Sequence, residues 1–361
     1  MKKIIYPITT LVIVFAGPVL LQSFSNKNNM PVGEIYVVTT LAGYSDKGLQ
    51  VDGKGDKAGF SSSVGNLFAT ADGNVFVMDQ GTLRKIDPDG KVTSLLGLIA
   101  FDAEGNQLKL EALKGPDGIC LDKAGNMYVS DGNGNMIYKI KPDMATEKLA
   151  GDNGYKGSDD GAALESGFNN PQGLCIDKAG NIYVADTYNY CVRKISADGK
   201  KVSTLAGSQG DFKPGTGKAA KLQEFRTVAV DSKGNVYVEQ NARGSCVAKI
   251  SPAGVVTSFV GDIEALTPDG NNDATGKAAR FFRINALAVD ANDNLIIGEN
   301  YRVRKATPAG VVTTLAGVNE PQWRDAVGDK ARFGMITGLS TDAKGNIYVS
   351  DSYCVRKISK Q

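Results

Sequence analysis

The chemistry open to this chain is limited first by what it lacks, because none of its 361 residues is histidine. Zinc sites with histidine ligands are therefore excluded, as are nucleophiles that depend on a histidine base in Ser–His–Asp or Cys–His arrangements. Carboxylates, amides, arginines and five cysteines remain. These groups suit oxygen ligation of a hard cation, or recognition of a ligand by polar side chains.

Mixed polar residues occupy one equivalent place in six copies of a repeated sequence unit. The place lies five residues before the aspartate that follows a strand-like run, and it holds Leu67, Asp117, Gln172, Arg226, Asn285 and Thr337. If the copies surround one axis, these side chains converge at the mouth of a central channel and can bind a small ligand or an ion. A polar, water-filled channel without a ligand is the simpler interpretation, and both stay open.

The residue types at this mouth point to two kinds of ligand. Asp117 and Asn285 are candidates to hold a metal such as a calcium ion, because carboxylate and amide oxygens are ligands for hard cations, and Gln172 can add a further oxygen. Arg226 would compete with a cation and favours a carboxylate or a sugar acid. We expect Asp117, Gln172, Arg226, Asn285 and Thr337 to form a ligand-binding mouth.

Acidic residues recur at a second place, after the second strand-like run of five copies. They are Asp79, Asp131, Asp186, Glu299 and Asp351. A ring of carboxylates can hold a cation, but an acid that recurs with the repeat is more typical of a structural residue. We expect these acids to accept hydrogen bonds from loop N–H groups or to pair with arginines of the next strand. Those arginines are Arg84, Arg193, Arg304 and Arg356.

Tyrosine and arginine gather in the links that follow these acids. The residues concerned are Tyr188, Tyr190, Arg243, Tyr301 and Tyr353. Tyrosine and arginine are common in recognition surfaces, so these links are candidates for ligand binding. The same composition is also common in solvated loops.

The five cysteines fall at equivalent places in different copies. Cys120 and Cys175 share one place, and Cys191, Cys246 and Cys354 share another, just before the third strand-like run. Equivalent places in different copies are too far apart for the Cα separation of about 4.4–6.8 Å that a disulfide needs. We therefore predict five buried free thiols that act as small hydrophobic residues.

Each copy predicts four short strands, here called A to D. The third copy shows them best, with strands A and B within 173–186, strand C at 192–195 and strand D at 202–207. Asp-Lys-Ala-Gly-Asn between A and B supplies an aspartate and a glycine suited to a hairpin turn. Alternating valine, isoleucine and tyrosine are typical of half-buried strands. One such sheet cannot bury both of its faces, so the copies must stack radially.

The order of the D strands predicts how the ring closes. One D-like segment, Val38–Gly43, precedes the first complete copy, whereas the last copy ends with its C strand at 355–358. The N-terminal segment therefore completes the last sheet, which removes the open edge of a linear stack.

These patterns resemble the NHL repeat. The resemblance rests on Asp-x-x-Gly-Asn-Ile-Tyr-Val-x-Asp, Val-Arg-Lys-Ile, Gly-x-Val-Thr-Thr-Leu-Ala-Gly and Ala-x-Phe, and it covers residues 34–358. It implies an all-β fold, a six-bladed β-propeller with four-stranded blades. The fourth copy departs from the pattern with Gln240 in place of the acid, and the fifth with Glu299 and Asp293. The resemblance implies no single function, because such propellers include binding platforms, RNA readers, sensors and metal-assisted hydrolases.

The first 25 residues are typical of an export signal. Lys2 and Lys3 precede a largely apolar run, and Ser23-Phe24-Ser25 provides small residues before a cleavage site. An uncleaved membrane anchor is the alternative. The remaining chain would have no net charge, which argues against nucleic-acid binding. We expect a signal peptide at 1–25, a propeller at 34–361, and a periplasmic or extracellular location.

The leading hypothesis is an exported, monomeric, non-catalytic binding or scaffold propeller without a cofactor. Its partner would be a protein, a peptide or a glycan at the face that carries the B-to-C links and the channel mouth. The alternative is a hydrolase that resembles the six-bladed lactonases and uses a divalent cation, such as calcium, in the channel.

Overall fold

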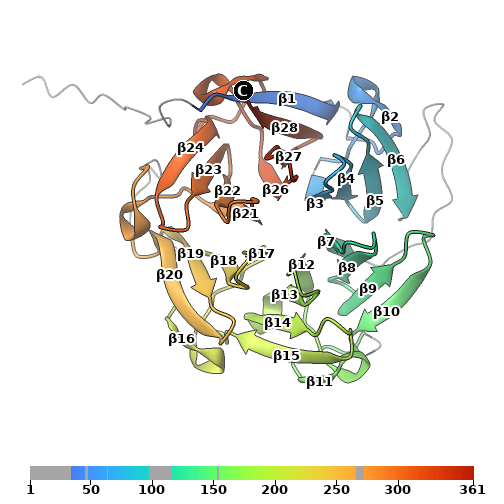
Figure 1. The fold of residues 1–361 in the computed structure, drawn as a ribbon, viewed down its shortest axis with the longest axis vertical. Helices are drawn as coiled ribbons and strands as arrows, with labels where there is room; N and C mark the ends of the chain where they lie inside the picture. The colour runs from blue at the N-terminus through green and yellow to red at the C-terminus, as the bar shows by residue number, and fades with distance from the viewer. Residues whose placement is uncertain (1–33, 45–47, 63, 97–114, 153, 266–271) are drawn as a thin grey trace, which may run out of the picture.

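Six antiparallel sheets surround a central axis in the computed structural model (Figure 1). The structure describes residues 34–44, 48–62, 64–96, 115–152, 154–265 and 272–361. The predicted signal at 1–25 lies outside the described residues. None of the helical segments in the described part of the chain, each a single 3-10 turn, is long and apolar enough to cross a membrane. The predicted six-bladed propeller is confirmed.

Blade three shows how the sequence forms one sheet. Its strands are β12 (Pro171–Ile176), β13 (Ile182–Asp186), β14 (Cys191–Ile195) and β15 (Lys201–Ala206), paired in that order. The first turn forms because one carboxylate oxygen of Asp177 accepts hydrogen bonds from the N–H groups of Ala179 and Asn181, each at 2.9 Å. Gly180 adopts a positive φ of 91° there, which is costly for other residues.

The other blades repeat this meander around the ring. Blade one holds β3 (Val64–Ala69), β4 (Val75–Asp79), β5 (Thr82–Ile86) and β6 (Lys91–Leu96). Blade two holds β7 (Pro116–Leu121), β8 (Met127–Asp131), β9 (Met136–Ile140) and β10 (Thr146–Ala150). Blade four holds β17 (Val228–Val230), β18 (Val236–Asn241), β19 (Ser245–Ile250) and β20 (Val255–Asp262). Blade five holds β21 (Ile284–Val289), β22 (Leu295–Glu299), β23 (Arg302–Ala306) and β24 (Val312–Gly317).

Blade six is assembled from both ends of the described chain. It holds β26 (Ile336–Thr341), β27 (Ile347–Asp351), β28 (Cys354–Lys360) and β1 (Tyr36–Gly43). Strand β1 pairs antiparallel with β28, with Val38 opposite Ile358, and both side chains are buried. Just before β1, Glu34 forms ion pairs with Lys305 at 3.0 Å and Lys360 at 2.7 Å. The predicted closure is confirmed, and Figure 1 shows β1 beside β28.

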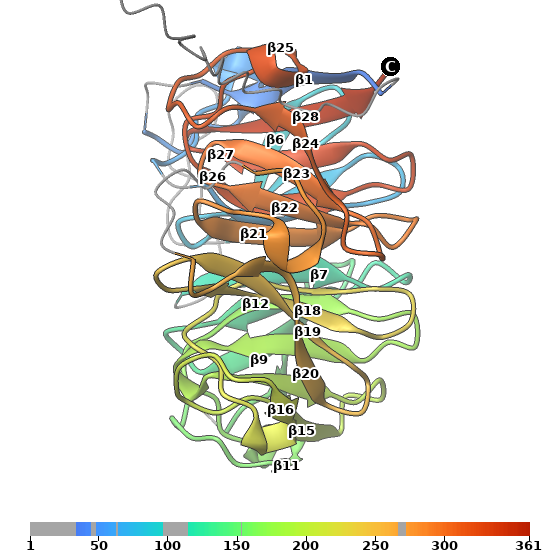
Figure 2. The same cartoon turned by 90° about the vertical axis from the view of Figure 1, so that its left-hand side faces the viewer.

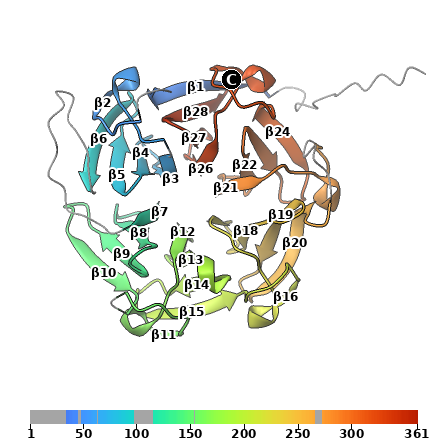
Figure 3. The ribbon, with the colours of Figure 1, turned by 180° about the vertical axis from the view of Figure 1, so that it is seen from behind.

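Four blades carry a fifth, outer strand that the sequence reasoning did not predict. These strands are β2 (Gly53–Lys54), β11 (Gly161–Ala162), β16 (Gly215–Thr216) and β25 (Ala326–Val327). Each pairs with the D strand of its own blade before the chain turns inward to strand A, so each lies at the perimeter of the ring (β2, β11 and β16 are labelled in Figures 1 and 3, and β25 in Figure 2).

Single 3-10 turns complete the secondary structure of the described residues. They are η1 (Gly55–Lys57), η2 (Ala163–Glu165), η3 (Thr187–Asn189), η4 (Gly217–Ala219), η5 (Gly276–Ala278) and η6 (Gly328–Lys330). Figure 2 shows the ring from its side, with hairpin loops at both ends of the blades.

Buried ion pairs hold four of the blades together internally. The pairs are Arg84–Asp79, Arg193–Asp186, Arg304–Glu299 and Arg356–Asp351, at 2.7 to 3.0 Å. Each guanidinium also lies over a phenylalanine ring, 4.6 to 5.2 Å from the ring centroid. In the same order, the rings belong to Phe60, Phe168, Phe281 and Phe333. The structural role predicted for these acids is confirmed, and the Ala-x-Phe motif supplies the ring in three of these blades, whereas Ser-Gly-Phe supplies Phe168 in blade three.

All five cysteines are free thiols, as predicted. Four are buried, whereas Cys175 is partly exposed. Burial raises the pKa of each thiol, to about 12 for Cys246 and Cys354.

Candidate functional site

A cavity of about 730 Å³ opens at the end of the channel where the A strands begin and the B-to-C links lie. Its volume falls within the range of about 300–1,000 Å³ typical of small-molecule sites. The five residues predicted for the mouth all line it, from five blades, and they are Asp117, Gln172, Arg226, Asn285 and Thr337. The structure therefore brings together the residues that vary from one repeat to the next.

Leu67 was also expected at this mouth, and that expectation is wrong. Its side chain is buried in the core, and Gly65 and Asn66 line the cavity in its place. The cause lies in the hairpin of blade one, where the turn begins at Thr70, whose backbone N–H donates to the Asn74 carbonyl at 2.8 Å. Thr70 is therefore the equivalent of the aspartate that begins the turn in other blades, and Leu67 lies two residues farther along strand A than the mouth residues of those blades.

The A strands converge because small residues allow close approach at the axis. The N–H of Gly173 donates to the carbonyl oxygen of Arg226 in the next blade at 2.9 Å. A Cβ at Gly173 would clash with that oxygen, and one at Gly118 would clash with the carbonyl oxygen of Gln172. Glycine at these two places therefore fixes the spacing of the side chains just before them.

Hydrogen bonds orient the amides of the mouth. The side-chain amide of Asn285 donates to Asn300 Oδ1 at 2.8 Å and to the carbonyl of Ile336 at 3.1 Å, so its own oxygen is free to accept from a ligand. Across the cavity, the Asn66 amide donates to Asp117 at 3.3 Å. Desolvation by burial raises the pKa of Asp117, although nearby Arg226 opposes the shift.

Glu239 is one of two functional candidates that the sequence did not predict, and Arg283 is the other. It lies in β18 and lines the cavity, where its carboxylate accepts hydrogen bonds from the backbone N–H of Arg226 at 2.6 Å and of Thr227 at 3.1 Å. Burial raises the pKa of Glu239 to about 8, against the effect of these hydrogen bonds. The equivalent residues of the other blades are Met78, Ser130, Ala185, Gly298 and Ser350.

Blade four departs from the repeat at two further places. Gln240 stands where other blades have the acid, and Ala248 stands where four of them have the buried arginine. The acid of this blade is thus Glu239, one residue earlier in the strand than in the other blades. Because successive side chains of a strand point to opposite faces, Glu239 faces the channel and not the interior of the blade. The absence of the repeated arginine–acid pair from blade four is the sequence signal that could have identified Glu239.

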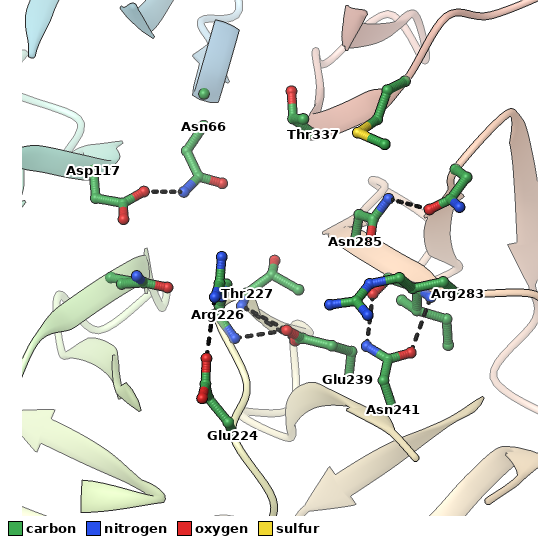
Figure 4. Close-up of a pocket in the computed structure, with 15 residues that line it drawn as sticks. Asn66, Asp117, Glu224, Arg226, Thr227, Glu239, Asn241, Arg283, Asn285 and Thr337 are labelled. Atoms are coloured by element: carbon green, nitrogen blue, oxygen red, sulfur yellow. Dashed lines mark hydrogen bonds and ion pairs between the residues drawn. The ribbon is translucent and has the colours of Figure 1, made fainter. Parts of the chain in front are cut away.

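Two arginines bring positive charge into the cavity (Figure 4). Arg226 forms an ion pair with Glu224 at 3.1 Å, near solvent. Arg283 precedes β21 and points into the cavity beside Glu239, as Figure 4 shows. Within the described part of the chain, no carboxylate lies within ion-pair distance of Arg283.

The residues predicted in the B-to-C links lie outside this cavity. Tyr188 and Arg243 are exposed, whereas Tyr190, Tyr301 and Tyr353 are partly buried, and none of the five lines the cavity. Their links emerge at the same end of the blades, so they surround the mouth without forming its wall. Their role in ligand binding stays a prediction.

The metal candidates do not form a ligand cluster. Among the described residues, no group of three or more Asp, Glu or Cys side chains is gathered as a metal site. Asp117 accepts from the Asn66 amide, and Asn285 offers one oxygen on the opposite wall.

Farther along the same six A strands, most side chains that line the channel are small or apolar. A second cavity of about 270 Å³ is lined there by residues such as Leu67, Cys120, Cys175 and Ala229. Charged and amide side chains therefore line one end of the channel, and that end is the candidate site.

The fold defines the class of this chain, a six-bladed β-propeller built from repeated blades. Its repeats are similar to NHL repeats, and the family model described as Teneurin NHL domain matches residues 47–214. Human Teneurin-4 is 26% identical over 330 residues, which cover 79% of this chain and 12% of Teneurin-4. Human NHL repeat-containing protein 2 is 34% identical over 165 residues, or 41% of this chain and 23% of that protein. The chain thus spans less than a third of these relatives.

Solved structures share the fold at low sequence identity. A protein of unknown function from Bacteroides thetaiotaomicron has a TM-score of 0.69 at 18% identity, over 91% of this chain and 76% of that one. An auxiliary nutrient binding protein from Bacteroides ovatus has a TM-score of 0.66 at 18% identity, over 91% and 77%. A gluconolactonase from Xanthomonas campestris has a TM-score of 0.56 at 14% identity, over 90% and 89%. At such identities these structures show the shared fold alone.

Proposed function

We propose that this chain is a non-catalytic binding protein that takes a glycan at the mouth of its channel. The observation that carries the proposal is the convergence of the repeat-breaking residues Asp117, Gln172, Arg226, Asn285 and Thr337 on one polar cavity of about 730 Å³. Amide, hydroxyl and carboxyl groups on several walls suit a ligand with many hydroxyls, because each ligand hydroxyl can both donate and accept.

Two further observations support this proposal. The tyrosines of the B-to-C links lie at the same end of the blades, where they can extend the contact of a chain-like ligand beyond the cavity. Two of the structures that share the fold are described as auxiliary nutrient binding proteins from Bacteroides species. An exported protein that binds nutrients outside the cytoplasm also agrees with the signal-like residues 1–25.

The proposal is tested by calorimetric titration of the full chain with a panel of neutral and acidic oligosaccharides. Asn285→Ala and Gln172→Ala should each weaken binding about tenfold, because each removes hydrogen bonds to the ligand. Lys178→Gln is the control, because Lys178 is exposed at the A-to-B turn, at the other end of blade three. Equal affinity of the mouth variants and the control would contradict the proposal.

The same preparation tests the hydrolase alternative. Lactone substrates are incubated with the full chain in calcium, and again after chelation of the metal. Calcium-dependent turnover that Asp117→Asn abolishes would overturn a non-catalytic role. We expect no turnover above that of the buffer.

A further inference from the structure

The charged groups of the cavity are arranged unevenly. Arg226 and Arg283 enter from the blade four side and the blade five side, and Glu239 lies between them (Figure 4). Asp117 is the acid of the opposite wall, and Glu224 stands at the rim, paired with Arg226. These five are the charged residues that line the cavity within the described part of the chain.

At neutral pH the wall that carries Arg226 and Arg283 presents positive charge to a ligand, while Asp117 faces it from the opposite wall. Burial holds the pKa of Glu239 near 8, so its carboxyl group is mostly protonated at pH 7. Glu224 compensates Arg226 in part, but that pair is exposed and therefore weak. Arg283 has no carboxylate within ion-pair distance in the described residues. Its guanidinium can therefore accept a carboxylate without first breaking an internal ion pair.

The opposite wall offers hydrogen-bonding groups of a different kind. Asn66 and Asp117 form a hydrogen-bonded pair there, and Gln172 lies beside them. Asn285 and Thr337 line the wall of blades five and six. A ligand with an acid at one end and hydroxyls at the other would meet matching groups on both sides.

We propose that the ligand is a sugar carboxylate, whose acid group binds Arg283 and Arg226 and whose hydroxyls face Asn66, Asp117 and Gln172. The proposal rests on the glycan-binding function argued above and narrows it to acidic sugars. Protonated Glu239 donates a hydrogen bond to the same carboxylate, in a site where an ionised Glu239 would repel it. The sugar acid can be free, or it can be the terminal residue of an acidic glycan.

The experiment compares acidic and neutral sugars of equal size on the full chain at pH 7. The probes are galacturonic acid against galactose, and trigalacturonic acid against galactotriose, measured by calorimetry. We expect the acids to bind at least about tenfold more tightly than the neutral sugars. A higher affinity for the trimer than for the monomer identifies a glycan terminus as the source, and equal affinity identifies the free acid; either result supports the proposal.

Arg283→Gln separates the contact from a general effect of charge. Arg283 makes no hydrogen bond or ion pair with the described residues, so the variant should fold normally, as circular dichroism and melting can verify. Its affinity for the acids should fall about tenfold or more, and by a larger factor than its affinity for the neutral sugars. Lys178→Gln removes the same charge from the far end of blade three and should change neither affinity.

The possible failures are distinguishable. Equal affinity for acidic and neutral sugars, or an Arg283→Gln variant that binds acids as wild type does, overturns the acidic-sugar proposal while the glycan-binding function stands. Absence of binding to every sugar overturns both.

Discussion

Arg193 donates a hydrogen bond from Nη1 to Asp186 Oδ2 at 2.9 Å, and neither side chain is exposed to solvent. The same arginine also donates to the carbonyl oxygens of Gly167 and Asp159, each at 2.7 Å. One guanidinium thus links strand C of blade three to the segment that enters the blade. The pair is a structural element of the blade and lies away from the channel.

Removal of one partner of this pair should destabilise the ring. Asp186→Ala removes the buried one of the two carboxylates that pair with Arg193, and the partly exposed Asp160 at 3.0 Å remains, so we expect a loss of about 1.5–3 kcal/mol in the free energy of unfolding. The double variant Asp186→Gln/Arg193→Ala reproduces the combination that blade four carries as Gln240 and Ala248, and it should lose less than Asp186→Ala. Urea denaturation measures both. A double variant less stable than the single one would show that the pair is not coupled in this way.

The closure of the ring should depend on pH through Glu34. Hydrogen bonds from Lys360, Tyr36 and Lys305 lower the pKa of Glu34 to about 2. A carboxyl group whose pKa is lower in the folded protein adds stability above its ordinary pKa of about 4.5 and loses it as the pH falls toward 2.

The variant Glu34→Gln isolates this effect. At pH 7 it should be less stable than wild type by about 1 kcal/mol or less, because the ion pairs are partly exposed. The difference should shrink as the pH falls from about 4.5 toward 2. Melting curves at several pH values test this, and a difference that stays constant down to pH 2 would contradict it.

Binding of an acidic sugar should weaken in alkaline solution. The pKa of Glu239 is raised to about 8, so this residue changes from a neutral donor to an anion as the pH passes that value. We expect affinity for galacturonic acid to fall above about pH 8, and Glu239→Gln, which stays neutral, to keep its affinity there. Titrations of both proteins from about pH 6 to about pH 9.5 make the comparison. A parallel loss in both proteins would assign the effect to another group.

The cysteines should be unreactive in the folded protein. Burial raises the pKa of every thiol, so little thiolate is available, and four of the five are inaccessible. A chromogenic disulfide reagent should modify Cys175 first and slowly, because it is partly exposed, and should reach all five after unfolding. Rapid modification of Cys246 or Cys354 in the native protein would show that the blades open locally.

Much of the fold could be predicted because the same pattern of strands and turns recurs six times in the sequence. Each Asp-x-x-Gly-Asn turn indicates a hairpin, and the displaced D strand at 38–43 indicates the closure with β28. The outer strands could not be predicted in the same way, because each is two residues long and lacks an alternating pattern.

The site was predictable where it follows the register of the repeat. Asp117 and Asn285 reach the cavity as expected, because both occupy the same position on strand A. Leu67 did not, since the turn at Thr70 lacks the aspartate from which the register was counted. Glu239 and Arg283 were missed because they lie on strand B and in an entry segment, and only the ring geometry brings them to the channel.

The pairing of β1 with β28 joins the ring by hydrogen bonds and side-chain packing, with no covalent link at that junction. If β1 detaches, blade six presents the unpaired edge of β28, which is complementary in register and side chains to β1 of any other copy. Two molecules that refold together at high concentration can therefore exchange this strand and form a domain-swapped dimer. The junction that makes one ring complete is also the place where this protein can self-associate.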